Sequence, residues 1–398
     1  MSGEQPAAAA AATAATTAAA AAPAGLGYRM PAEWEPHTRT WMGWPERPDN
    51  WRQGGAPAQR AFAAVAAAIA QFEPVTVAAN EAQVANARAM LPASVEVVCI
   101  PQDDAWLRDT GPTFVLREEA SGQRSLGGID WVFNAWGGGE GGMYATWERD
   151  QAVAATVLQA ASARRFACPI VMEGGSLHAD GEGTLLTTEE CLLNPNRNPS
   201  LSRDEIEGWL RRMLGVQKVI WLPRGLCGDD DTNGHIDNFA CFARPGTVLL
   251  AWTDDASDPQ HEISVEALRV LSQATDAKGR QLKVVKVPCP PPLHYSQDEA
   301  EGVKEVHGSK ARVAGDRLAA SYINFYLCNG GLVMPAFGGA AAEADKRAQQ
   351  ALAEAFPGRR VVAVPTRDIV LGGGNIHCIT QQQPATTATT ATAPAVGM

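Results

Sequence analysis

The sequence predicts an α/β fold built from a repeated unit of two strands, a helix and a further strand. Three observations support this fold class. Short runs rich in aliphatic and β-branched residues recur along the chain, and segments with helical periodicity lie between some of them. Glycine pairs also recur, at 127–130, 173–176, 338–340 and 372–375, as expected for turns between units.

The individual elements follow from local patterns. Strands are predicted in the apolar runs 75–79, 95–100, 112–116, 184–188, 218–223, 247–252, 282–288, 323–327, 331–337 and 360–365. Helices are predicted at 58–72, 150–165, 202–214, 261–274 and 343–356. The segment 202–214 is the best delimited, because Ser202 suits an N-cap and Gly215 suits the end of the last turn. Five such helices suit five repeats of the unit.

The composition predicts one globular domain between two low-complexity tails. Residues 1–27 are rich in Ala and Thr, as are residues 385–398, and neither stretch has the pattern of a packed core. No linker interrupts residues 28–384, so we expect a single catalytic domain there. The N-terminal stretch has no basic region and little strong hydrophobicity, which argues against a signal peptide or membrane span.

Charge and cysteine usage exclude several classes of protein. The formal net charge of -11 argues against a partner such as nucleic acid or an anionic membrane. The eight cysteines show no C-x-x-C spacing, so a zinc ribbon or a thioredoxin-type site is not expected. Reduced thiols and a cytoplasmic location are expected, with plastid import through the Ala-rich N-terminus as the alternative.

Four polar clusters interrupt this β-rich sequence. The first, 103–112, places several charges around Trp106, and a solvated loop is its bland interpretation. In the second, 171–183, Glu173 precedes a Gly pair that lets backbone approach closely. The third, 228–242, contains His235 and Asp237, which would share one face of an extended strand. The H-x-D spacing alone is a weak signal, because a lone His is more often structural.

The fourth cluster, 371–380, contains a glycine triplet followed by His377 and Cys378. A buried core thiol is the bland interpretation of Cys378, and a nucleophile beside a cleft is the sharper one. Adjacent strand residues face opposite sides, so His377 would face away from Cys378 and is not expected to be the catalytic histidine.

Together the clusters predict nucleophilic chemistry on a cation. Cysteine and histidine suffice for acyl transfer, which needs no surplus of carboxylates. Extra carboxylates beside an aromatic residue indicate a planar cation, and a guanidinium can be held by two of them. Its charge would also favour the thiolate of Cys378.

Six motifs resemble the agmatine deiminases of the guanidino-modifying pentein superfamily, most closely the plant-type branch. They are "MPAEWEPHTRTWMGWPERPDNW" (30–51), "DDAWLRDTGPTFV" (103–115), "GGIDWVFNAWGG" (127–138), "EGGSLHADGEGTLLTTEECLLNPNRNP" (173–199), "GDDDTNGHIDN" (228–238) and "GGGNIHCITQQQP" (372–384). The resemblance implies a five-fold pseudosymmetric α/β propeller. It also implies hydrolysis of agmatine to N-carbamoylputrescine and ammonia, in putrescine formation, without a metal or organic cofactor.

The resemblance also assigns roles to residues. It implies Cys378 as nucleophile and His235 as general acid and base. Asp109 and Asp237 would hold the guanidinium, and Glu173 would orient the histidine.

The remaining assignments concern binding of the substrate. Trp106 would line the substrate slot, and Gly373 and Gly374 would let backbone pass close to the substrate. The ammonium of agmatine needs a further acid, for which Asp231 is the first candidate and Asp230 the second.

Other interpretations use the same residues. An arginine or peptidyl-arginine deiminase, an amidinotransferase, a thiol hydrolase and a non-catalytic binder of guanidines are the alternatives. A metalloenzyme using His235, Asp237 and Glu173 is a further one on residue types alone. The expected partner is a small cationic guanidino substrate, and a homodimer is the expected assembly.

Overall fold

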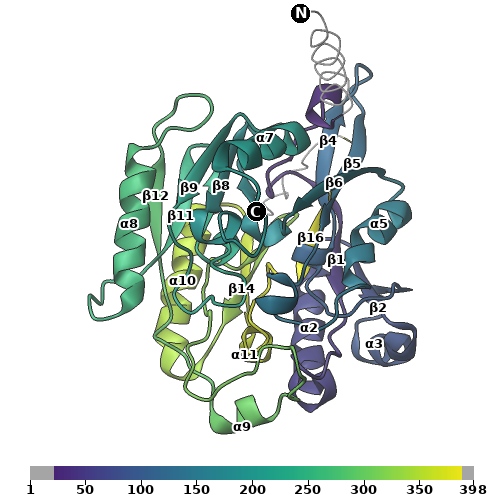
Figure 1. Ribbon diagram of the computed structural model, residues 1–398, viewed down its shortest axis with the longest axis vertical. Coiled ribbons are helices and arrows are strands. Elements are labelled where there is room, and N and C mark those ends of the chain that lie inside the picture. The colour runs from purple at the N-terminus through teal and green to yellow at the C-terminus, as the bar shows by residue number, and fades with distance from the viewer. Residues whose placement is uncertain (1–21, 388–398) are drawn as a thin grey trace, which may run out of the picture.

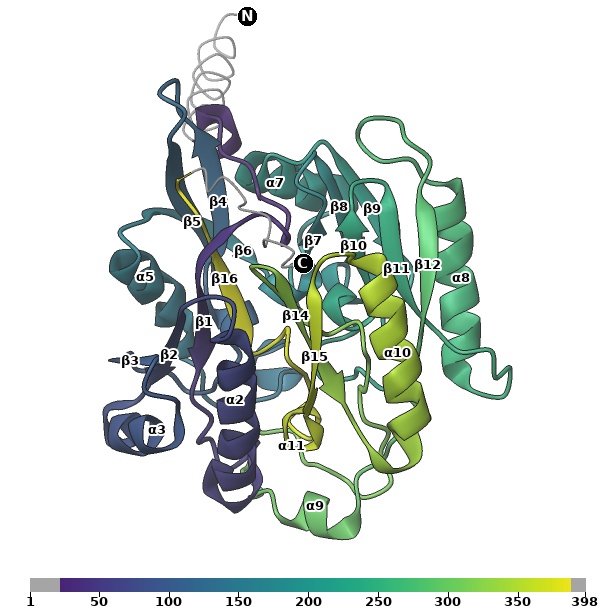
Figure 2. The same ribbon diagram turned by 180° about the vertical axis from the view of Figure 1, so that it is seen from behind.

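The computed structural model describes residues 22–387, and Figures 1 and 2 show it from opposite sides. The predicted tails, 1–27 and 385–398, lie mainly outside the described residues. Within the first of them, Ala24–Leu26 form a 3₁₀ turn (η1), and Leu26 packs against a buried apolar cluster. No helix among the described residues is both long enough and apolar enough to cross a membrane.

The described strands form five separate sheets of mixed direction. The first sheet joins β16 (Thr380–Pro384), β1 (His37–Gly43), β2 (Val75–Ala79) and β3 (Glu96–Cys99). The others join β4 (Thr113–Glu118), β5 (Arg124–Val132) and β6 (Arg164–Val171); β7 (His178–Ala179), β8 (Thr184–Thr188) and β9 (Lys218–Leu222); β10 (Ala240–Arg244), β11 (Thr247–Trp252) and β12 (Lys283–Pro288); and β13 (Tyr326–Cys328), β14 (Gly331–Ala336) and β15 (Arg360–Pro365).

One connectivity repeats in all five sheets. The first strand pairs antiparallel with the second, and the third strand returns parallel to the second. A parallel return needs a crossover, and a helix supplies it in each unit. The crossover helices are α2 (Ala56–Ile69), α5 (Asp150–Ala160), α7 (Arg203–Leu214), α8 (Pro259–Gln273) and α10 (Ala342–Ala355). The α/β class and this order of elements agree with the sequence prediction.

Shorter helices lie within and between the units. They are α3 (Val84–Met90), α4 (Leu107–Thr110), α6 (Glu189–Leu192), α9 (Gln297–Glu301) and α11 (Arg367–Val370). The remaining 3₁₀ turns are η2 (Arg52–Gly55), η3 (Glu81–Gln83), η4 (Gly138–Glu140), η5 (Gly174–Ser176), η6 (Ile236–Asn238) and η7 (Gly339–Ala341).

Capping and apolar spacing explain the long helices. Ser202 accepts from the backbone N–H of Glu205, and the Glu205 side chain accepts from Ser202, which forms a capping box on α7. Gly215 ends this helix in the left-handed region with φ 69°. In α10 the buried residues Ala344, Ala348 and Leu352 recur every four positions, so one face packs on its sheet. Figure 2 shows α10 beside β15.

Three sequence predictions need correction. The predicted helix 150–165 ends at Ala160, and β6 begins at Arg164, because the alternating residues of β6 bury every second side chain. The segment around His235 and Asp237 is the 3₁₀ turn η6 rather than a strand, which begins only at Ala240. Cys378 likewise lies in a turn before β16.

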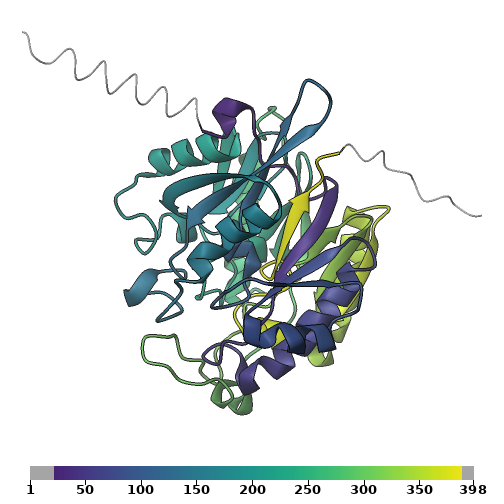
Figure 3. The same cartoon turned by 90° about the vertical axis from the view of Figure 1, so that its right-hand side faces the viewer.

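The two ends of the described chain meet in one sheet. Strand β16 pairs antiparallel with β1, and Figure 3 shows the yellow strand beside the purple one. Polar side chains that no strand pattern would predict are buried here. Trp41 Nε1 donates to Gln383 Oε1 at 2.9 Å, and Gln381 donates to the carbonyl of Pro112. This pairing brings the segment around Glu33 close to the residues that precede β16.

Candidate active site

Each of the five sheets begins with a strand that follows closely after one polar side chain of a common cluster. Asp109 precedes β4, Glu173 precedes β7, Asp237 precedes β10, Asn324 precedes β13 and Cys378 precedes β16. All five side chains are buried. The repeated connectivity therefore brings residues that are far apart in sequence to one centre.

Cys378 lies at the middle of this cluster. Its side chain is 3% exposed, and its Sγ atom lies 3.5 Å from Asp237 Oδ2. Asn324 Nδ2 donates to the same sulfur at 3.1 Å. The thiol is thus held by one amide and one carboxylate, and it reaches a cavity of about 270 Å³ that Trp106 also lines.

The glycine triplet gives this cavity its room. A Cβ on Gly374 would lie 2.9 Å from Cys378 Sγ and 2.7 Å from Trp106 Cζ3. Gly373 has φ 106°, and a Cβ there would collide with Asp231. A larger residue at 374 would fill the space in front of the thiol, and one at 373 would displace Asp231. Both glycines line the cavity, as the sequence predicted for close approach of backbone.

Asp109 and Asp237 approach the thiol from different units. Asp109 accepts from the indole N–H of Trp136 at 2.9 Å and from the backbone N–H of Gly175 at 2.8 Å. Asp237 Oδ2 accepts from His377, whereas Asp237 Oδ1 is buried without a hydrogen-bond partner in the described structure. A Cβ on Gly175 would lie 2.9 Å from Asp109 Oδ1 and 3.0 Å from Asp237 Oδ2. The two carboxylates can therefore converge only because residue 175 is glycine.

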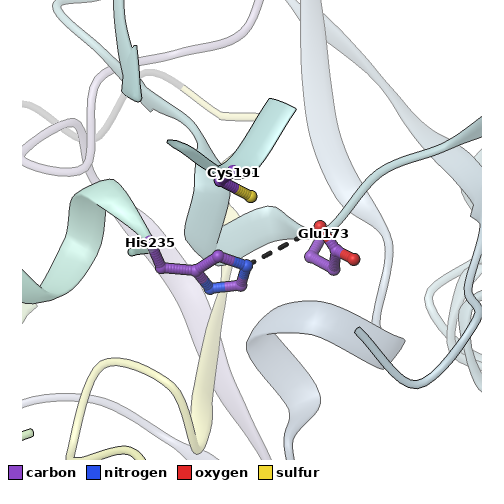
Figure 4. Close-up of side chains that lie close together, drawn as sticks. All are labelled: Glu173, Cys191 and His235. Carbon is purple, nitrogen blue, oxygen red and sulfur yellow. Dashed lines mark ion pairs between the residues drawn. The ribbon is translucent and has the colours of Figure 1, made fainter. Parts of the chain in front are cut away.

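His235 lies behind the two carboxylates and is fully buried. Its Nδ1 is 3.9 Å from Asp109 Oδ2, and its Nε2 is 3.6 Å from Glu173 Oε2. Figure 4 shows the imidazole edge directed at Glu173, with Cys191 on the same side. Both ring nitrogens are without a hydrogen-bond partner, so the ring is free to take or give a proton.

The negative charge of Glu173 is balanced by Arg197, a residue that was not predicted from the sequence. Arg197 Nε donates to Glu173 Oε1 at 2.6 Å, and both side chains are fully buried. Burial opposes ionisation of Glu173, but the Arg197 guanidinium holds the pKa of this carboxyl below its ordinary value. Glu173 thus presents its second oxygen to His235 as an anion.

The charges of the cluster are unequal. Burial raises the pKa of Asp109 to about 6, and the negative charges of Asp237 and Glu173 add to this effect. Burial alone would lower the pKa of His235, but the carboxylate of Asp109 and its other neighbours raise it well above its ordinary value. His235 is therefore an imidazolium in the resting site, suited to act as a general acid.

Cys378 is a neutral thiol in the resting site. Burial raises its pKa well above the ordinary value, and the charges of Asp237 and Asp109 raise it further. A cation placed between these carboxylates would cancel their repulsion of a thiolate. The arrangement therefore couples formation of the nucleophile to binding of a cation.

The walls of the cavity are aromatic. Trp106, Trp136 and Tyr144 line it together with Met143. Trp106 stacks on Trp51 with ring centroids 5.2 Å apart, and its indole N–H donates to Asp104. Flat rings fixed in this way suit a narrow, planar and cationic group.

Of the two candidate acids for a distal ammonium, only Asp231 lines this cavity. Asp230 is exposed and lines a neighbouring cavity. Asp231 is not a free carboxylate, because Lys310 donates to Asp231 Oδ1 at 2.8 Å and Arg312 donates to Asp231 Oδ2. Both cations lie in the segment after α9, which the sequence analysis did not connect with the site.

One group of side chains could offer donors to a metal ion. Among the described residues, Glu173, Cys191 and His235 place one donor atom each within 4.8 Å of one another. This set differs from the His235, Asp237 and Glu173 set considered from the sequence. The Arg197 guanidinium on Glu173 opposes a divalent cation here, because it already neutralises that carboxylate.

Several contact residues were missed from the sequence for different reasons. Arg197 and Trp136 lie within quoted motifs, so their neighbourhood was a usable signal. Asn324 lies in the predicted strand 323–327 and carried no chemical signal. His377 was expected to face away from the site, which is wrong. In the turn before β16, His377 and Cys378 both contact Asp237, because consecutive turn residues do not alternate as strand residues do.

Comparison with known proteins agrees with this geometry. Residues 29–384 match the family described as Porphyromonas-type peptidyl-arginine deiminase. An agmatine deiminase of Ectopseudomonas mendocina is 57% identical over 365 residues, which are 91% of this chain and 97% of that protein. The chain belongs to the agmatine deiminase family.

Plant and bacterial agmatine deiminases match the chain to a similar degree. An agmatine deiminase of Medicago truncatula is 55% identical over 368 residues, which cover 91% of this chain and 98% of that protein. A structure of the agmatine deiminase of Enterococcus faecalis superposes with a TM-score of 0.87 at 43% identity, covering 92% of this chain and 98% of that one. These identities do not separate a plant-type branch from a bacterial one.

Proposed function

We propose that this protein, a hydrolase of the agmatine deiminase family, converts agmatine and water to N-carbamoylputrescine and ammonia through a covalent amidino-cysteine. The observation that carries this proposal is the position of Cys378. Its sulfur lies beside Asp237 at the end of an aromatic cavity that Asp109 also lines. Such a site binds a planar cation and presents a nucleophile to its central carbon.

Binding of the guanidinium prepares the nucleophile. Asp109 and the unpartnered Oδ1 of Asp237 accept from the guanidinium nitrogens, which places the central carbon against Cys378. The positive charge lowers the pKa of the thiol, and its proton leaves to solvent as the cation enters. The net charge around the guanidinium is therefore unchanged by binding.

The first half of the reaction forms the covalent intermediate. The thiolate attacks the guanidinium carbon and gives a tetrahedral adduct with two amino groups. His235 donates its proton to one of them, the C–N bond breaks, and ammonia leaves. Cys378 then carries an amidinium group through a new C–S bond, and His235 is neutral.

The second half releases the product. Neutral His235 takes a proton from water, and the hydroxide adds to the amidinium carbon. As the C–S bond breaks, the hydroxyl proton passes to the departing sulfur, so the carbonyl of N-carbamoylputrescine forms and the resting thiol of Cys378 is restored. Glu173 supports both halves by facing His235 with its free oxygen while Arg197 holds the other.

The test of this function is an ammonia-release assay on the purified protein. We expect release from agmatine at a kcat/KM far above that for arginine or a peptidyl arginine. Preference for either of the latter would favour the runner-up, a deiminase for another guanidino substrate. Transfer of the amidino group to an added amine would favour an amidinotransferase.

Asp231 is our candidate for the ammonium of agmatine. We expect Asp231→Asn to raise KM for agmatine about tenfold, because an amide cannot form the charge-assisted hydrogen bond to the ammonium. The KM for a guanidine that lacks the ammonium should change little in this variant. Asp230→Asn is the matched control, since this exposed neighbour does not line the cavity. Equal KM values for Asp231→Asn and wild type would contradict the assignment.

The acid limb of the pH profile should report Asp109. This carboxyl must be ionised to bind a guanidinium, and burial raises its pKa to about 6. We therefore expect kcat/KM for agmatine to fall as the pH is lowered through about 6, where Asp109 becomes protonated. The Asp231→Asn variant should keep this limb, because it leaves Asp109 unchanged. A profile without an acid limb between about pH 7 and pH 5 would contradict the role of Asp109.

The five sheets also support a proposal about the arrangement of the whole fold. We propose that the five sheets are the blades of a five-fold pseudosymmetric propeller. Their shared strand order supports this arrangement, and so does the polar side chain that precedes the first strand of each sheet. Because these side chains come from positions between 109 and 378, we also propose that residues 28–384 act as one catalytic domain.

The cytoplasm remains the proposed location and a homodimer the proposed assembly. All eight cysteines are unpaired, which agrees with a reducing compartment. Size-exclusion chromatography with light scattering would test the dimer, and a fluorescent fusion would separate the cytoplasm from a plastid.

A further inference from the structure

A second buried histidine lies directly beneath the substrate carboxylates. His377 Nδ1 lies 2.8 Å from Asp237 Oδ2, and His377 Nε2 lies 2.7 Å from Glu33 Oε1. All three side chains are almost fully buried. The mechanism above uses Asp237 but gives no role to His377 or Glu33.

The geometry fixes the protonation of this histidine. A nitrogen of an imidazole must carry a proton to bond a carboxylate at such a distance. Because both nitrogens face carboxylates, both must donate, and His377 is an imidazolium. Burial opposes this charge, but Glu33 and Asp237 together raise the pKa of His377 above its ordinary value.

The charge of Glu33, the second carboxylate that contacts His377, also follows from its neighbours. His178 Nδ1 accepts from the backbone N–H of Phe242 at 3.2 Å, so the proton of a neutral His178 is on Nε2. That Nε2 lies 3.6 Å from Glu33 Oε2, and Arg108 Nη1 lies 3.6 Å from Glu33 Oε1. Glu33 is therefore an anion that faces His377, His178 and Arg108.

We propose that His377, clamped by Glu33, is a positioning residue that keeps Asp237 ionised and leaves only Asp237 Oδ1 free for the guanidinium. It occupies Oδ2 from below, so the carboxylate cannot rotate or take a proton there. This explains why the pKa values of Asp237 and Asp109, which lie in the same cluster, are shifted in opposite directions. The bond from His377 lowers the pKa of Asp237, whereas that of Asp109 is raised.

The proposal rests on the proposed function and is tested by two variants of the same residue. Asn in place of His377 puts an amide N–H where Nδ1 was, so it keeps the bond to Asp237. Gln in its place extends toward Glu33 and loses that bond. We expect His377→Gln to lose about 10- to 100-fold in kcat/KM for agmatine and His377→Asn to lose clearly less. Equal losses in the two variants would overturn the proposal.

The pH profile separates positioning from mere stability. Glu33, Asp237, Arg108 and His178 are the titratable or charged side chains facing His377. Glu33→Gln removes one of its two anions, so the imidazolium is lost at lower pH. The alkaline limb of kcat/KM should then move to lower pH. A purely structural role would lower the melting temperature and leave this limb in place, which would contradict the proposal.

A measurement on the resting protein keeps the inference independent of turnover. Nitrogen NMR of histidine-labelled protein should show both nitrogens of His377 protonated at about pH 8, well above the ordinary histidine pKa of about 6.5. His377→Asn identifies the signal, and His261→Asn, on α8 and remote from the cluster, is the control. A neutral His377 would overturn the proposal, whereas absence of ammonia release by the wild type would instead overturn the function.

Discussion

Cys378→Ser will reduce ammonia release from agmatine by about 10⁴-fold or more, because a serine hydroxyl has no accessible anion at neutral pH. Agmatine binding should largely survive, since Asp109 and Asp237, which we propose to hold the guanidinium, are unchanged. Stopped assays measure the first effect, and calorimetric titration of the variant measures the second. Near-normal turnover in this variant would rule out the covalent scheme.

A control variant and a second measurement sharpen the experiment on Cys378. Cys227→Ser is the matched control. Cys227 is a half-buried thiol in the loop between β9 and η6, and it does not line the cavity. It should retain activity. Wild-type protein quenched during turnover should carry the amidino group on the peptide containing Cys378. The same peptide from Cys378→Ser should be unmodified.

His235→Asn should lower kcat by about 10²- to 10⁴-fold, the usual range for loss of a general acid and base. Asparagine is uncharged, so it can neither protonate the departing ammonia nor deprotonate the attacking water. The pH profile of kcat should also lose the limb that reports the His235 imidazolium, whose pKa is raised by the surrounding carboxylates. A variant whose kcat and pH profile both match wild type would contradict the role of His235.

His261→Asn controls for the loss of a histidine without loss of the site. Its Nδ1 contacts only the carbonyl of Thr253 among the described residues, far from the cluster in sequence and on the outer helix α8. Activity should be unchanged. Melting curves of both variants would show that the His235 effect is not unfolding, because His235 is fully buried and its replacement also alters packing.

Local patterns were sufficient for most of the repeated unit. All five crossover helices were predicted near their observed positions, because apolar spacing and caps act within a few residues. The strands that were missed are β1, β5, β7 and β16, and β10 was expected to begin too early, at His235 and Asp237. Polar composition hid β1 and β16, whose buried Gln and Thr side chains are satisfied only by partners from the other end of the chain.

The sequence by itself determined the chemistry. A thiol after a glycine triplet, a histidine among acids and carboxylates beside a tryptophan together predicted nucleophilic attack on a guanidinium. The surplus of carboxylates favoured a guanidinium over an acyl group, because acyl transfer does not need them. The glycines were also interpretable, because only backbone without a side chain can approach so closely.

Only the tertiary structure decided which groups act together and with what charge. It brought Arg197 to Glu173, Asn324 to Cys378, and Glu33 through His377 to Asp237. It also showed Asp231 paired with Lys310 and Arg312. The physical reason is that a buried charge is set by every group within a few ångströms. Those groups come from different sheets, which local sequence does not relate.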